Sequence, residues 1–149
     1  MRLYFAGPLF NDNELVFNAR IAEAIERFSY DVFLPQWDGF ELGSDPEIVG
    51  TRAEAQAIFD LDRDNVLACD VLLCMLDGRV PDEGMAVELG LAYADRSHHR
   101  LDRYLIGYAT QNRYFWGAGF NAMLTGALDE IYHDETTPLD RLRVIAEAV

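Results

Sequence analysis

Short apolar runs alternate with longer amphipathic stretches along the whole chain. A few apolar residues that end at a turn are typical of a strand, whereas apolar residues at a 3.6-residue period predict a helix. We expect strands at residues 2–6, 31–35, 71–76, 104–108 and 130–132. We expect helices at residues 13–28, 51–68, 83–94 and 121–128, and a last helix from Thr137 onward.

The run at residues 71–76 decides the fold class. It shows no alternation of apolar and polar residues, which indicates a strand buried on both faces in the centre of a parallel sheet. Strands and helices alternate without repeats or linkers, so we predict a single α/β domain over residues 1–149. The expected architecture is a doubly wound, flavodoxin-like five-stranded parallel sheet with helices on both faces.

Ligands of such sheets bind outside the carboxyl ends of the strands, at the switch in strand order. The segments after Ala6, Pro35 and Leu76 are therefore expected to line a site. Capping signals mark several helix starts: the capping boxes Ser44-x-x-Glu47 and Thr51-x-x-Glu54, and an N-cap at Thr137 with Pro138 at the first helical position.

The charge of the chain restricts its partners. The formal net charge is −14, from 26 acidic residues and 12 basic residues that are all Arg. A surface this negative repels phosphate backbones, so nucleic acid and anionic membranes are excluded as partners, whereas a small neutral substrate is compatible. No signal peptide or membrane-spanning stretch is evident, and we expect a soluble, cytoplasmic protein. Cys69 and Cys74 lie in an apolar stretch without a matching His pair, and we expect small buried hydrophobes.

Two carboxylates occupy apolar helix faces. The helical neighbours of Glu88 are Gly84, Met85, Leu91 and Ala92, and those of Asp62 are Ile58, Phe59, Asn65 and Val66. Acidic side chains are rarely buried without a partner, so this pair indicates a site that uses carboxyl chemistry. The alternative is two partly exposed acids near helix ends.

Asp82 stands at the start of the helix that carries Glu88. Its simplest role is that of an N-cap, but the position also places a carboxylate beside the expected crevice. Gly84 and Gly90 would allow close approach of a backbone or a sugar around the helix start.

Other catalytic constellations are missing from the sequence. It contains no GxxxxGK[ST] loop and no GxGxxG after the first strand, and the Gly-x-Gly at residues 117–119 follows an aromatic loop. The three histidines (His98, His99 and His133) lie near turns and are expected to be solvated, and no metal ligands are grouped. We therefore expect no metal and no cofactor, with carboxylates as the reactive groups.

The segments around these acids resemble a known family. The segments are Tyr4-Phe5-Ala6-Gly7-Pro8-Leu9-Phe10, then Asp62 eight residues before Asp70, then Asp82-Glu83-Gly84-Met85-Ala86-Val87-Glu88-Leu89-Gly90, and finally Asn121-Ala122-Met123. Together, in this order, they resemble the nucleoside 2-deoxyribosyltransferases, and the D-x-G-x-x-x-E-x-G segment with the other three is the fairly specific part.

The resemblance implies a role for each matching residue. Glu88 matches the nucleophile that holds the deoxyribose covalently, Tyr4 the residue that orients it, and Asp62 the acid that protonates the leaving base. Asp82 and Asn121 of the partner subunit match the residues that hold the sugar 5′-hydroxyl, which implies a homo-oligomer. The other implied substrate-binding residues are Gln36 at the base edge, Phe10 and Trp37 as a base sandwich, and Met123 and Gly7. The implied substrates are a 2′-deoxyribonucleoside and a free purine or pyrimidine base.

The residue types agree with this chemistry. Cleavage of an N-glycosidic bond develops positive charge on the sugar, which a carboxylate stabilises and then captures. A second acid with a raised pKa protonates the departing base, and an incoming base completes a double displacement with retention of configuration. The apolar face of Asp62 suits a raised pKa, while ionised Glu88 needs a hydrogen bond that Tyr4 could supply.

The sequence also departs from the family and leaves alternatives open. Family members often end in a carboxylate that reaches the active site, whereas this chain ends in a predicted helix at Val149, and residues 38–54 form a connector where base specificity is expected to be decided. One alternative is a deoxynucleoside 5′-monophosphate N-glycosidase, which binds phosphate with serines and a Gly/Arg-rich first loop; here that loop is acidic and Asn121 replaces a serine. The other is a non-catalytic nucleoside- or nucleotide-sensing α/β domain, which has no need of Glu88.

Overall fold

Five parallel strands form one sheet in the order β2-β1-β3-β4-β5, which is the flavodoxin-like order predicted from the sequence. The computed structural model describes residues 1–39, 50–99, 101–110 and 119–148. The strands are β1 (Arg2–Ala6), β2 (Asp31–Phe33), β3 (Val71–Met75), β4 (Tyr104–Tyr108) and β5 (Glu130–Tyr132). The helices are α1 (Asp12–Glu26), α2 (Pro35–Asp38), α3 (Arg52–Ala68), α4 (Glu83–His98), α5 (Ala122–Ala127) and α6 (Thr136–Glu147).

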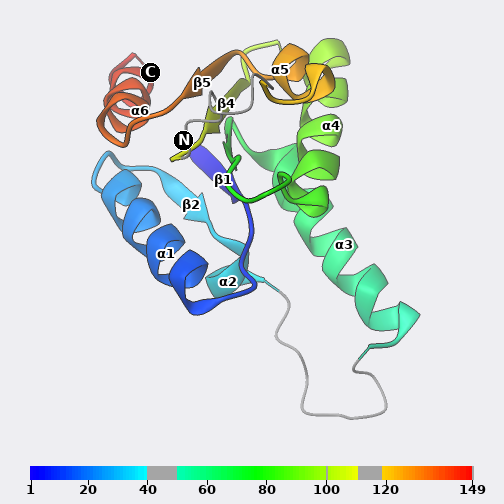
Figure 1. The fold of residues 1–149 in the computed structure, drawn as a ribbon. Coiled ribbons are helices and arrows are strands. Elements are labelled where there is room, and N and C mark those ends of the chain that lie inside the picture. The colour runs from blue at the N-terminus through cyan, green and yellow to red at the C-terminus, as the bar shows by residue number, and fades with distance from the viewer. Residues whose placement is uncertain (40–49, 100, 111–118, 149) are drawn as a thin grey trace.

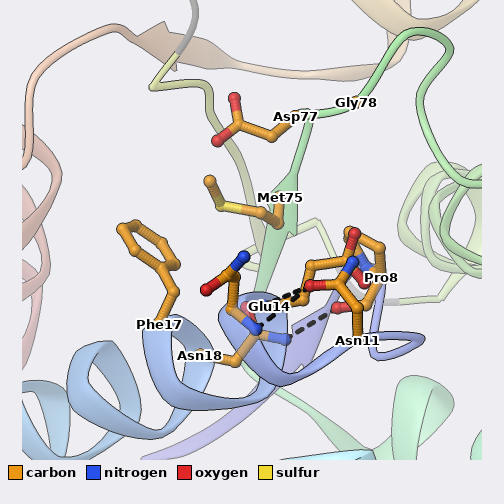
Figure 2. A pocket seen from close by; sticks show the side chains of 9 residues that line it. Pro8, Asn11, Glu14, Phe17, Asn18, Met75, Asp77 and Gly78 are labelled. Carbon is orange, nitrogen blue, oxygen red and sulfur yellow. Dashed lines mark hydrogen bonds between the residues drawn. The ribbon is translucent and has the colours of Figure 1, made fainter.

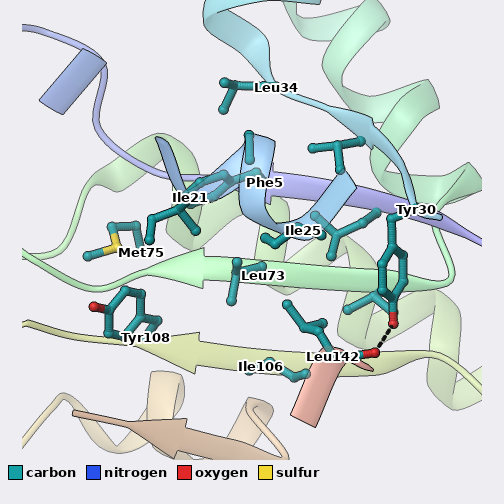
Figure 3. Packing of buried hydrophobic residues seen from close by; sticks show 14 of the residues in the cluster. Phe5, Ile21, Ile25, Tyr30, Leu34, Leu73, Met75, Ile106, Tyr108 and Leu142 are labelled. Atoms are coloured by element: carbon teal, nitrogen blue, oxygen red, sulfur yellow. Dashed lines mark hydrogen bonds between the residues drawn. The ribbon is translucent and has the colours of Figure 1, made fainter. Parts of the chain in front are cut away.

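Helices cover both faces of the sheet, as Figure 1 shows. Side chains alternate along each strand, so Leu3 and Phe5 of β1 face α1 and α6, whereas Tyr4 and Ala6 face α3 and α4. The α1–α6 face buries a continuous apolar cluster, part of which is drawn in Figure 3. All five residues of β3 are buried, which confirms the central strand predicted from its uninterrupted apolar run.

The N-terminal half of α3 extends beyond the sheet (Figure 1). Only Glu54 and Val66 of this helix are buried, and Phe59 is exposed. The C-terminal half packs against α4 on the same face of the sheet. This arrangement places Asp62 near the point where α3 meets both α4 and β1.

Most predicted element boundaries lie within two residues of the observed ones, and the short helix α2 was not predicted. Three of the differences have a local cause. The second strand ends at Phe33, not Pro35, because Pro35 starts α2 and the carboxylate of Asp38 accepts the backbone N–H of Leu34. Helix α4 runs to His98, beyond the predicted end at residue 94. The prediction stopped early because the last turn is polar and shows no apolar period. Basic residues in that turn suit the helix dipole.

The last helix begins at Thr136, one residue before the predicted N-cap at Thr137. The prediction was wrong because Asp134 takes the capping role and accepts the backbone N–H of Thr137 at 2.8 Å. Pro138 is therefore the third helical residue and not the first.

The second predicted capping box is found at the start of α3. Thr51 Oγ1 accepts the N–H of Glu54, while the Glu54 carboxylate reaches back to the N–H of Gly50, one residue earlier than in the standard box. Some predicted features lie outside the described residues: the first capping box at Ser44 and Glu47, residues 117–118 of the Gly-x-Gly segment, and Val149. Within the described part of the chain, no helix is both long and apolar enough to cross a membrane.

Candidate active site

Tyr4 and Glu88 form a hydrogen-bonded pair on the α3–α4 face of the sheet. The Tyr4 hydroxyl donates to Glu88 Oε1 at 2.7 Å, from a side chain that is completely buried. The Tyr4 ring stacks on Phe33 of the neighbouring strand, with the centroids 5.2 Å apart. Strand pairing therefore fixes the ring, and the ring in turn fixes the orientation of the glutamate.

Burial alters the protonation of Glu88. Desolvation, partly offset by the hydrogen bond from Tyr4, raises the pKa of Glu88 from 4.5 to about 7, and the nearby carboxylates of Asp62 and Asp82 add to the increase. None of the groups that act on this pKa is cationic. Near neutral pH the carboxyl is therefore present in both its acid and its carboxylate form.

Asp62 belongs to the same cluster. Desolvation raises the pKa of Asp62, and its interaction with the Tyr4 hydroxyl opposes that increase. The pKa of Tyr4 is raised as well, by desolvation and then by the charges of Glu88 and Asp62. The phenol therefore stays protonated and acts as a donor. The structure thus brings together the three residues for which the sequence predicted catalytic roles.

Asp82 is the N-cap of α4, and its carboxylate accepts the backbone N–H of Met85 at 2.8 Å. Asp82 therefore has the N-cap role that the sequence predicted as its simplest one. A β-carbon at Gly84 would lie 2.9 Å from Asp82 Oδ2, so glycine at this position leaves room for the cap. Since the Asp82 charge also acts on Glu88, the cap and the reactive carboxyl share one environment.

The remaining predicted substrate-binding residues of the first two loops lie at the carboxyl ends of β1 and β2. A β-carbon at Gly7 would come within 2.6 Å of Met75 Cβ, so the close approach of the loop to β3 requires glycine. Phe10 is 76% exposed and Trp37 47% exposed. Gln36 donates through Nε2 to the carbonyl of Leu15, while its Oε1 is buried and has no partner among the described residues.

Asn121 and Met123 lie at the start of α5, more than 30 residues along the sequence from Glu88. Asn121 is the N-cap of α5 and accepts the N–H of Met123, whose side chain is 81% exposed. A groove of about 500 Å³ separates α5 from α4 and is lined mainly by small and apolar residues. Within one chain, no hydrogen bond of the described residues joins Asn121 to Glu88 or Asp62.

A second hollow, of about 340 Å³, lies at the carboxyl ends of β1 and β3 on the α1 side (Figure 2). The segments after Ala6 and Leu76 line it, as the switch-point rule predicts, but the residues after Pro35 do not. Phe17, Met75 and Asp77 surround it. The reactive carboxyl groups lie on the opposite face of the sheet, so this hollow is separate from the Glu88 cluster.

Two further buried residues lie near the cluster, Cys74, which was expected to be a small buried hydrophobe, and Arg103, which was not singled out from the sequence. Cys74 lies on β3 beneath Glu88, whose charge acts on the thiol, and the thiol is free and fully buried. Arg103 is buried beside the ends of α3 and α4. The burial of Cys74 is therefore confirmed, whereas no sequence signal reveals Arg103. Among the described residues, no group of three or more His, Cys, Asp or Glu side chains could hold a metal ion.

Comparisons with known proteins find similar structures that cover nearly the whole chain. A conserved protein from Enterococcus faecalis V583 is 25% identical, with a TM-score of 0.78 over 97% of this chain and 98% of that chain. The 2-deoxyribosyltransferase of Bacillus psychrosaccharolyticus is 19% identical, with a TM-score of 0.75 over 94% and 91% of the two chains. A CMP N-glycosidase of Clostridium botulinum is 16% identical, with a TM-score of 0.59 over 95% and 98%. The last two likenesses show a shared fold.

The sequence itself carries the family signal. No curated protein sequence matches the chain. The model of the family described as nucleoside 2-deoxyribosyltransferase, however, matches residues 3–140, which include Tyr4, Asp62, Glu88 and Asn121. The chain therefore belongs to the nucleoside 2-deoxyribosyltransferase family.

Proposed function

We propose that this protein exchanges the base of a 2′-deoxyribonucleoside through a covalent deoxyribosyl–Glu88 intermediate. The observation that supports this most is the Tyr4 hydroxyl, which donates to Glu88 at 2.7 Å and also interacts with Asp62. It joins a candidate nucleophile and a candidate acid through one fixed donor. A nucleoside-exchanging enzyme of this kind would serve nucleoside salvage in the cytoplasm.

In the first half-reaction, Glu88 attacks the anomeric carbon of the deoxyribose. Because Tyr4 occupies Oε1, the second oxygen of the carboxylate is available for the new bond. The C–N bond to the base breaks with its electron pair on the base nitrogen, and protonated Asp62 donates the proton that the leaving base requires. The products are a neutral free base, a glycosyl ester on Glu88 and an ionised Asp62.

In the second half-reaction, a nitrogen of the incoming base attacks the same carbon and displaces Glu88 as a carboxylate. The incoming base loses a proton to Asp62, which restores the starting protonation of both carboxyls. Each displacement inverts the anomeric carbon, so the two together retain the configuration. A raised pKa suits Asp62 to both proton transfers.

The other matching residues would bind the substrate. Asp82 would hold the sugar 5′-hydroxyl through the carboxylate oxygen that does not cap α4. Phe10 and Trp37, both exposed at the carboxyl ends of β1 and β2, would sandwich the base, with Gln36 at the base edge. Gly7 would keep the first loop close to β3 beside the sugar.

Asn121 and Met123 would complete the site of a neighbouring subunit. Both are exposed, and they border the apolar groove between α4 and α5. Val87 and Tyr93 of α4 are also exposed near this face, which adds to its apolar surface. A homo-oligomer that covers this face would bring Asn121 of the partner subunit toward the cluster around Glu88.

Hydrolysis of a nucleoside 5′-monophosphate is disfavoured by the first loop. A phosphate at this loop would need its backbone N–H groups, yet the carboxylate of Glu14 already accepts the N–H of Phe10 at 2.8 Å. The side chain of Asn11 likewise accepts the N–H groups of Asn13 and Glu14. An anion would have to displace a carboxylate and meet its negative charge.

A base-exchange assay tests the proposal directly. The protein is incubated with deoxyinosine or thymidine and a second free base, and the new nucleoside is separated by chromatography. Glu88→Gln should abolish exchange, while the matched control Glu83→Gln, an exposed acid at the start of the same helix, should retain it. Intact-protein mass spectrometry should detect a deoxyribosyl adduct on the wild type and none on Glu88→Gln.

The other outcomes identify the alternatives. Release of free sugar from a 5′-monophosphate alone, without exchange, would replace the proposal with an N-glycosidase. Binding of nucleosides without turnover would favour a sensing domain. Exchange that survives Glu88→Gln would refute the assignment of the nucleophile.

A further inference from the structure

Arg103 is a fully buried arginine in the turn that leads into β4. Its side chain has no exposed surface, and an arginine is almost never buried in this way unless its donors are satisfied. The contacts that satisfy it come from two helices, α3 and α4. These are the helices that carry Asp62 and Glu88.

On one side the guanidinium binds the end of α3. Nη2 donates to the carbonyl of Leu67 at 2.6 Å, and Nε donates to the carbonyl of Cys69 at 3.0 Å. The last carbonyls of a helix have no partner within the helix, so Arg103 supplies donors that α3 lacks. It thereby fixes where α3 ends.

On the other side the same guanidinium binds α4. Nη1 donates to the carbonyl of Ala92 at 3.2 Å, and Nη2 lies 3.0 Å from the carboxylate of Asp95. One rigid, planar group therefore joins the two helices through three main-chain carbonyls and one carboxylate.

The contacts lie close to the reactive pair along each helix. Asp62 precedes Leu67 by five residues and Glu88 precedes Ala92 by four, which correspond to about 7.5 Å and 6 Å along the helix axes. A shift of α3 relative to α4 at the Arg103 contacts would therefore alter the spacing of Asp62 and Glu88 around Tyr4. Arg103 itself is not among the groups whose charge acts on Glu88.

We propose that Arg103 is a positioning residue for the glycosyl-transfer centre: it locks α3 against α4 so that Asp62 and Glu88 meet the same Tyr4 hydroxyl. This inference rests on the proposed function. Arg103 contacts neither carboxyl group directly in the structure and acts through the backbone of the two helices. Lysine cannot replace it, because a single ammonium cannot span carbonyls on two helices as the planar fork does.

The first test compares the kinetics of two variants that weaken the Arg103 contacts with those of a control variant. Arg103→Lys keeps the charge but loses the fork, and Asp95→Ala keeps the arginine but removes its carboxylate partner. We expect kcat to fall by at least about 10-fold for Arg103→Lys and by a smaller factor for Asp95→Ala, because a small misplacement of catalytic groups has a large effect on rate. KM should change by less than about 3-fold, since no substrate contact is removed.

The control is Arg141→Met on the opposite face of the sheet. Arg141 pairs with Glu130 and lies on α6, so its loss reduces stability without touching α3 or α4. Rates are measured well below each variant's melting temperature. Equal losses of kcat in Arg141→Met and Arg103→Lys would overturn the inference, because the effect would then be one of general stability.

The second test does not depend on turnover. The side-chain carboxyl of Glu88 is titrated by ¹³C NMR in the wild type and in Arg103→Lys, with Glu88→Gln to assign the signal. Glu88 faces Tyr4 on β1, Asp62 on α3, Asp82 at the start of its own helix and the Cys74 thiol on β3. Burial is the largest of the influences that raise its pKa, so a looser contact between α3 and α4 should admit water and lower the midpoint toward 4.5.

An unchanged midpoint together with an unchanged kcat would overturn the positioning role. If the wild type shows no base exchange at all, the proposed function fails, while the NMR titration still decides whether Arg103 holds the Glu88 environment. If Arg103→Lys does not fold, Asp95→Ala carries both tests, because it weakens the same contact from the exposed side.

Discussion

Glu88 is a carboxyl group whose ionisation is opposed by its surroundings. Its pKa of about 7 exceeds the ordinary value of 4.5, with desolvation as the main cause. A group whose pKa is raised by folding stabilises the native state only while it is protonated. The stability that protonated Glu88 contributes is therefore complete below pH 4.5 and is lost as the pH rises through 7. The buried Glu88 carboxylate therefore lowers stability at neutral and alkaline pH.

The substitution Glu88→Gln should therefore stabilise the protein at alkaline pH. Glutamine keeps an oxygen that accepts from Tyr4 but cannot ionise, so the gain in the free energy of unfolding should be roughly 2–3 kcal/mol at pH 8 and small at pH 4.5. Urea unfolding at the two pH values measures it. An equal effect at both would show that the ionisation of Glu88 is not opposed by burial.

Tyr4→Phe should shift the pH dependence of exchange. Loss of the hydroxyl removes the hydrogen bond that lowers the pKa of Glu88, so the acidic limb of the kcat profile should move above 7. At pH 7 we expect kcat to fall by about 10–100-fold, the range for a hydrogen bond to a charged group. Tyr30→Phe is the control, because its hydroxyl binds the carbonyl of Leu142 on the other face. A Tyr4→Phe profile that keeps the wild-type limb would contradict the role given to the hydroxyl.

For single residues, the sequence indicated Asp62 and Glu88 but not Arg103. Helix spacing determines which side chains share a face, so apolar neighbours were enough to predict that Asp62 and Glu88 are at least partly buried. The contacts of Arg103 are mainly main-chain carbonyls, which exist at every residue and leave no pattern in the sequence. The partner of Glu88 on β1 was implied by the family resemblance, since strand and helix lie 84 residues apart.

At the scale of elements, α4 depends on Asp82 for its first turn. Asp82→Ala should lower the free energy of unfolding by about 1 kcal/mol through loss of the cap. Asp82→Ser should restore most of that stability, because serine is also a good N-cap, but it lacks the carboxylate proposed to hold the sugar. KM for the nucleoside should therefore remain raised in Asp82→Ser. If Asp82→Ser recovers both stability and KM, Asp82 acts only as a cap.

Element types were predictable from the sequence, whereas several ends were not. Short apolar runs sufficed to predict all five strands. The reason is clearest for the central strand β3, which is buried along its whole length. The ends depend on local hydrogen bonds that compete for the same N–H groups. Asp134 takes the capping role that the sequence assigned to Thr137, and Asp38 accepts the N–H of Leu34 at the start of a short helix that the sequence did not predict. Two residues that could equally cap a helix cannot be ranked without geometry.

At the scale of the whole molecule, the uncovered surface lies on the side that holds the reactive carboxyls. Phe59, Val87, Tyr93 and Met123 are exposed on α3, α4 and α5, whereas α1 and α6 each expose one large apolar side chain, Val16 and Val144. The sequence could not reveal this surface, because these residues keep the same helical period as core residues. A helix that extends beyond its own sheet, as α3 does, becomes evident only in the folded chain (Figure 1).

Mixing two inactive variants tests whether Asn121 serves a neighbouring subunit. In a two-fold dimer of Glu88→Gln and Asn121→Ala chains, one site combines both defects, while the other combines an intact Glu88 with Asn121 of the partner subunit. Random assembly should therefore restore about one quarter of the wild-type exchange activity. Co-expression followed by the exchange assay measures it, with each variant alone as the control. Activity no higher than that of Asn121→Ala alone would place Asn121 in its own chain's site, because no mixed dimer could then contain a complete one.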